Sequence, residues 1–109
     1  MNLKYLKVDM DYCSSPLWGS TSRQGFANLD EPYYIDRINR STVSILEWYR
    51  YMWEWQQMQN DQALCYYLGS IIIDIKIKAA KLLKQELPDH FIFYSFYKEN
   101  GRKMLIEVL

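Results

Sequence analysis

The chain has 109 residues, and its thirteen basic and thirteen acidic side chains give a formal net charge of zero. This length predicts a single domain, residues 1–109, with enough residues to bury one core without disulfides. Nucleic-acid-binding domains usually carry a basic excess, so the balanced charge argues against a nucleic-acid partner.

The first predicted element is a half-buried strand. Residues 3–12 alternate, with Leu6, Val8, Met10 and Tyr12 on one face and charged residues on the other. Pro16 cannot donate to a ladder, so we expect the strand to end near Cys13. The next segment, GSTSRQGFANL at 19–29, is rich in small polar residues and predicts a loop.

Three helices are predicted next. Asp30 and Pro32 start a short one over about 32–39, and Ser41 or Thr42 caps a second that runs to about residue 59. Asn60-Asp61 marks a break, and a third helix follows over 62–86. Its run IIIDIKIK also fits a strand, but the sequence after it continues the helical spacing well.

The last twenty residues predict a β-hairpin. Two apolar runs flank Asn100-Gly101, which suits a type I′ turn and would place Tyr97 opposite Met104. With the N-terminal strand, this gives an α+β fold: a three-stranded antiparallel sheet covered on one face by two to three helices.

Aromatic residues exceed what one small core needs. They make up 17% of the chain, and Trp48, Tyr51 and Trp55 lie off the stripe that would dock the second helix. Both faces of the predicted hairpin are apolar as well. Three interpretations follow: the 13–29 loop buries the surplus, a second copy covers it in a homodimer, or it binds another protein.

The sequence does not favour catalysis. His90 is the only histidine, so a metal site is poorly supplied and we expect none. Asp9 and Asp11 form the most suggestive polar pair, either as paired carboxylates of an enzyme or as a solvated strand face. No phosphate-binding loop or Ser-His-Asp arrangement is present. We therefore expect no enzyme activity, no cofactor and no small-molecule substrate.

Several features predict a cytoplasmic protein. Two cysteines are too few for the disulfide framework of a small secreted domain. The N-terminal stretch MNLKYLKVDMDY lacks the apolar segment of a signal peptide. The longest apolar run, ALCYYLGSIII, is too short and too polar to span a membrane, so we expect no membrane contact.

One short motif resembles a known family. A strand running into Asp11-Tyr12-Cys13, followed by Pro16-Leu17-Trp18, is similar to the N-terminal pattern of small bacterial immunity proteins from contact-dependent inhibition and related polymorphic toxin systems. The motif covers about eight residues, and the rest of the chain agrees in layout. The loop after Trp18 departs from the pattern, because it holds Arg23 where we expect an acidic stretch.

The resemblance implies a cytoplasmic inhibitor of one cognate toxin domain, a nuclease or similar enzyme. Trp and Tyr anchors with charges around them suit such tight binding. The candidate contacts are the acids Asp9, Asp11, Glu31 and Asp36 and the aromatic residues Trp18, Tyr33, Tyr34, Trp48 and Trp55. The alternative is a homodimeric structural or regulatory module with no toxin partner.

Overall fold

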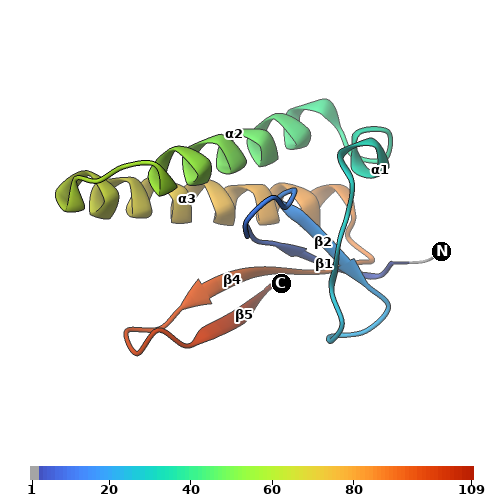
Figure 1. Ribbon diagram of the computed structural model, residues 1–109. Coiled ribbons are helices and arrows are strands. Elements are labelled where there is room, and N and C mark those ends of the chain that lie inside the picture. The colour runs from blue at the N-terminus through green and yellow to red at the C-terminus, as the bar shows by residue number, and fades with distance from the viewer. Residues whose placement is uncertain (1–2) are drawn as a thin grey trace.

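The computed structural model describes residues 3–109, except for the side chains of residues 32 and 33. Its elements are, in chain order, β1 (Tyr5–Val8), β2 (Leu17–Ser20), β3 (Ala27–Asn28), α1 (Glu31–Ile35), α2 (Arg40–Gln57), α3 (Gln62–Glu86), β4 (Phe91–Tyr97) and β5 (Lys103–Val108). The predicted α+β class is confirmed. α3 packs on β4 and β1, and α2 packs on α3 (Figure 1).

The sheet is larger than predicted and is mixed. Within residues 3–109 it has five strands in the order β3-β2-β1-β4-β5. β1 does join the C-terminal hairpin, but it pairs with β4 in parallel, with Leu6 beside Ile92. The predicted all-antiparallel, three-stranded sheet is therefore wrong in its strand number and in this pairing. The long helical connection between β1 and β4 supplies the crossover that parallel neighbours need.

The segment predicted as a loop after Cys13 contains two strands. β1 ends at Val8, earlier than expected, and the chain returns as β2, which pairs with β1 through Val8 opposite Leu17. Leu17 is buried under the helices. The apolar pair after Pro16 thus begins a strand, and its two side chains point to opposite faces of the sheet.

The long third helix matches the predicted range at both ends. The Asp61 side chain accepts a hydrogen bond from the backbone N–H of Leu64 (3.1 Å), as an N-cap does. The buried side of α3 consists of Leu68, Ile72, Ile75, Lys76, Ala79, Ala80 and Leu83. The run IIIDIKIK therefore lies in a helix, and the buried side of this helix covers the sheet.

The first two helices start and end differently from the prediction. α1 stops at Ile35, and α2 begins at Arg40 with Asn39 as its N-cap residue, so Ser41 and Thr42 lie inside the helix and do not cap it. Asn39 donates its backbone N–H to the Glu86 carboxylate (2.5 Å). A residue distant in sequence thus satisfies one of the first backbone donors of α2.

The hairpin forms as predicted, but its register is shifted by one residue. Tyr97 lies opposite Lys103, not Met104, and Phe93 lies opposite Glu107. The Gly101 N–H donates to the Lys98 carbonyl (2.8 Å), and Gly101 has a φ of 80°. A type I′ turn needs positive φ at both central residues, and Asn100 does not have it. The connection is instead a three-residue loop with glycine in the left-handed position.

Candidate protein-binding surface

A tight turn follows β1 and projects one aromatic ring into solvent. The Asp11 N–H donates to Ser14 Oγ (2.9 Å), and the Ser14 N–H donates to the Asp11 carbonyl (3.2 Å). Cys13 adopts a φ of 57°, in the left-handed region that non-glycine residues seldom enter. The Tyr12 side chain is 77% exposed as a result. The sequence pattern had placed Tyr12 on the buried face of a strand, which is wrong because β1 ends four residues earlier.

Beside this turn lies a groove of about 560 Å³ against the second half of α2. The Tyr12 ring meets the Trp53 ring of α2 nearly edge-on, with ring centroids 6.0 Å apart. We call this the turn groove, and its lining is Met10, Asp11, Tyr12, Cys13, Ser14, Arg50, Trp53, Glu54, Gln57 and Met58.

The solvent side of α2 carries a second apolar stripe. Its side chains are Trp48 (51% exposed), Tyr51 (65%), Trp55 (44%) and Met58 (71%). The 3-4-3 spacing of these residues places them on one side of the helix, with Met58 as the C-cap residue directly after it. The docking residues Leu46 and Tyr49 lie elsewhere on the helix and are almost fully buried. We call these four residues the outer stripe.

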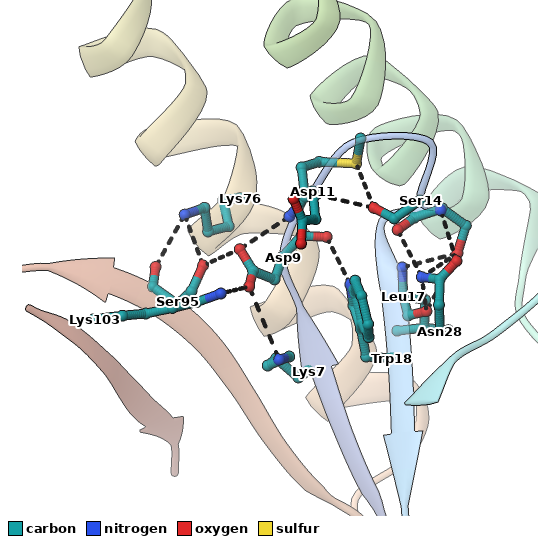
Figure 2. Close-up of polar contacts among 12 residues, drawn as sticks. Lys7, Asp9, Asp11, Ser14, Leu17, Trp18, Asn28, Lys76, Ser95 and Lys103 are labelled. Atoms are coloured by element: carbon teal, nitrogen blue, oxygen red, sulfur yellow. Dashed lines mark hydrogen bonds and ion pairs between the residues drawn. The ribbon is translucent and has the colours of Figure 1, made fainter. Parts of the chain in front are cut away.

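Asp9 and Asp11, the acidic pair singled out in the sequence, differ in burial: Asp9 lies in the core and Asp11 on the surface. Asp9 is 2% exposed, although the pattern had placed it on an outer strand face. Its carboxylate accepts from Ser95 Oγ (2.6 Å) and pairs with Lys103 and, at 3.9 Å, with Lys7 (Figure 2). Asp11 is exposed and lies beyond the strand. The two carboxylates therefore do not share a strand face as predicted.

Lys76 completes this buried cluster from α3. Its ammonium donates to the Ser95 carbonyl (2.9 Å) and to Ser95 Oγ (3.0 Å), and Ser95 directly follows the last β4 residue that pairs with β1 (Figure 2). Burial lowers the pKa of Lys76, although the Asp9 charge opposes this. Burial is the largest single influence on the pKa of Lys103 and lowers it, but the hydrogen bond to Asp9 and the charges of Asp9 and its neighbours together outweigh burial and raise the pKa. The cluster ties β1, β4, β5 and α3 together.

Trp18 packs within the monomer. Its indole N–H donates to the Asp9 carbonyl (3.1 Å), and the Lys7 ammonium lies 4.8 Å from the ring centroid. Nearby, Asn28 Oδ1 accepts a hydrogen bond from the Ser15 N–H (2.9 Å) and so joins the segment before β2 to β3. Trp18 is half-buried in this setting, which leaves part of one ring for a partner.

The remaining predicted contacts differ in accessibility. Tyr34 is fully buried, and its hydroxyl donates to the Glu47 carboxylate (2.6 Å). Tyr34 and Asp9 are therefore removed from the candidate contacts, because their side chains are inside the protein. Glu31 and Asp36 are exposed at the two ends of α1. The side chain of Tyr33 lies outside the described residues.

The structure brings Trp48 and Trp55 together on the outer stripe and places Asp11 in the adjoining turn groove. Sequence reasoning did not select Tyr12, Glu54 or Met58 as contacts. Met58 had a detectable signal, because it continues the 48-51-55 spacing by one more step. Tyr12 had none, since its exposure depends on where β1 ends.

Comparison with known proteins found no matching family model, curated protein or solved structure. Within residues 3–109, no helix has the length and apolar character needed to cross a bilayer. The same residues contain no group of three His, Cys, Asp or Glu side chains placed to hold a metal ion.

Proposed function

We propose that this protein is an immunity protein that binds and neutralises a cognate bacterial toxin domain in the cytoplasm. The observation that carries the proposal is the outer stripe, which exposes two Trp, one Tyr and one Met on a single helix face. Trp and Tyr dominate the energetics of protein interfaces, and a monomer seldom exposes a contiguous apolar patch of this kind without a use for it.

Two further features support the proposal. Of the two segments that carry the family resemblance, Asp11-Tyr12-Cys13 lines the turn groove, and Pro16-Leu17-Trp18 leads into β2. The charged flank of the outer stripe holds Glu47 and Glu54, with Arg50 between them. A toxin that acts on nucleic acid needs a basic surface, and this flank complements one.

A homodimer through the same stripe is the alternative function. The 3-4-3 spacing suits packing against a second copy of the helix. The flank opposite Glu47 and Glu54 carries Ser41 and Met52, which have no charge. Two copies would therefore bring acidic flanks together or set them against an uncharged side. Charge thus favours a basic partner over a second copy.

The test is co-expression with the toxic domain encoded by an adjacent reading frame. The intact protein should restore growth, and Trp48→Ala with Trp55→Ala should weaken binding by about 30-fold or more, as expected for interface anchors. Tyr66→Ala is the matched control, because Tyr66 is 85% exposed on α3 and is not one of the outer-stripe residues. Circular dichroism and thermal unfolding check that each variant is folded.

Two results would contradict the proposal. The first is an adjacent frame that encodes no toxicity that this chain suppresses. The second is sedimentation equilibrium that shows a dimer which Trp48→Ala and Trp55→Ala convert to monomers. That second result would favour the homodimeric module.

A further inference from the structure

The turn groove combines aromatic and acidic groups in one concavity. Its apolar wall includes the Trp53 ring, the Tyr12 ring and the side chains of Met10 and Met58. Asp11 and Glu54 also line it. A groove of about 560 Å³ is large enough for one long side chain of another molecule.

The charges around the turn groove do not balance. Arg50 is the one basic residue in its lining, and it pairs with Glu54 (Nε to Oε1, 2.9 Å) and with Glu47 (3.9 Å). Asp11 Oδ1 accepts the N–H of Tyr12 (2.8 Å), and among the described residues no side chain forms a salt bridge with Asp11. Within the lining, the carboxylates of Asp11 and Glu54 outnumber the one guanidinium by one negative charge, beside exposed rings. Lys7 and Lys103 act on the Asp11 charge from outside the groove.

We propose that the turn groove receives an arginine side chain from the protein partner. A guanidinium stacks on aromatic rings and also pairs with carboxylates. The turn groove offers an arginine side chain both of these contacts. The aliphatic stem would lie on Trp53 and Met58, and the charged end would meet Asp11 and Glu54. This inference rests on the proposed function for the identity of the partner, but the groove chemistry is tested without the toxin.

The first experiment is an NMR titration of the full chain with N-acetyl-arginine amide. We expect chemical-shift changes concentrated at residues 10–14 and 50–58, with millimolar affinity. N-acetyl-citrulline amide has nearly the same shape without the charge and should bind at least about fivefold more weakly. That factor corresponds to about 1 kcal/mol for one exposed ion pair.

Variants locate the binding to the turn groove. Asp11→Asn with Glu54→Gln should weaken arginine amide binding at least about fivefold. These near-isosteric changes keep the size of the side chains and leave Glu47 to pair with Arg50. Glu99→Gln is the matched control, because it removes an exposed acid from the hairpin loop. Equal shifts with the citrulline analogue, scattered shifts, or unchanged binding by the double variant would overturn the inference.

The second experiment separates this inference from the proposed function. If the toxin binds, the double variant should raise the dissociation constant at least about tenfold and flatten its dependence on salt. If the toxin binds the wild type and the double variant equally, the proposed function stands and the arginine site is overturned. Specific arginine binding without a neutralised toxin supports the site and contradicts the proposed function.

Discussion

Asp9 is a buried carboxylate surrounded by lysines. It is 2% exposed, yet Lys7 and Lys103 pair with its carboxylate, and Lys76 reaches it through Ser95. One anion therefore offsets three nearby cations in a mostly buried site. Because an unpaired buried charge is costly, the stability of this cluster depends on Asp9 more than on any one lysine.

We expect Asp9→Asn to lower the free energy of unfolding by about 3–5 kcal/mol, since it leaves buried lysines without their counter-charge. Adding Lys76→Met should recover part of that loss, because it removes the most buried of the three cations. Urea unfolding of both single variants and the double variant measures the coupling. Strictly additive losses would show that the two residues do not act as one cluster.

Tyr34 links stability to alkaline pH. Burial, together with its hydrogen bond to Glu47 and the charge of Glu31, raises the pKa of the Tyr34 hydroxyl, although Arg50 opposes this. The unfolded tyrosine loses its proton near pH 10, while the folded one keeps it. The stability that Tyr34 contributes is therefore complete below about pH 10 and declines as the pH rises above it.

Tyr34→Phe should lower the free energy of unfolding at about pH 8 by about 1.5–3 kcal/mol, the value of a hydrogen bond to a charged group. Between about pH 8 and pH 11 the variant should lose about 1.4 kcal/mol less than the wild type, because one raised tyrosine pKa has been removed. Urea midpoints at the two pH values measure the difference. Parallel losses in both proteins would contradict this assignment of Tyr34.

At the scale of elements, two glycines have opposite roles. Gly101 holds a φ of 80° in the hairpin loop, a conformation that costs an L side chain energy. Gly69 lies within α3, where an added Cβ would meet only the Gln56 amide nitrogen at 3.4 Å, an ordinary contact. Glycine is thus required in the loop but weakens the helix.

Gly101→Ala should therefore lower the free energy of unfolding by about 1 kcal/mol. Gly69→Ala should raise it by about 0.5–1 kcal/mol, because alanine restricts the unfolded chain and favours the helix. Each variant serves as the control for the other in thermal unfolding. Destabilisation by Gly69→Ala would indicate that the crossing of α2 and α3 is tighter than the structure shows.

At the scale of the whole molecule, the sheet is covered differently on its two faces. The helices cover the face with Leu6 and Ile92, and the loop between β2 and β3 covers Phe93 on the other. The Phe26 ring lies edge-on to Phe93 at 6.2 Å, and Arg23 lies over the same ring and reaches Glu107 on β5 (3.6 Å). For Phe93, this packing agrees with the interpretation in which the 13–29 segment buries surplus aromatic surface, one of the three left open by the sequence.

Phe26→Ala should lower the free energy of unfolding by about 1–2 kcal/mol, less than a fully buried Phe, because Phe26 is only partly covered. The exposed Gln24→Ala in the same loop is the control and should change stability by less than about 0.5 kcal/mol. Urea unfolding measures both variants. Equal effects would mean that the loop does not pack on the second face.

The sequence determined the features that depend on local patterning. α3 follows from a continuous apolar stripe and an Asp61 cap, and the hairpin follows from two apolar runs around a glycine. The outer stripe was also visible in part, since Trp48 and Trp55 are seven residues apart. Helical periodicity and capping act between residues close in the chain, so they can be predicted without knowing the tertiary fold.

Only the tertiary structure decided which of these residues a partner can reach. The length of β1 placed Asp9 inside and Tyr12 outside, and the parallel pairing with β4 brought Ser95 to Asp9 across 86 residues. Tyr34 belongs to the core cluster, and its hydroxyl donates to Glu47 of α2. Strand ends, register and burial depend on contacts between distant segments, and no local pattern of side chains specifies them.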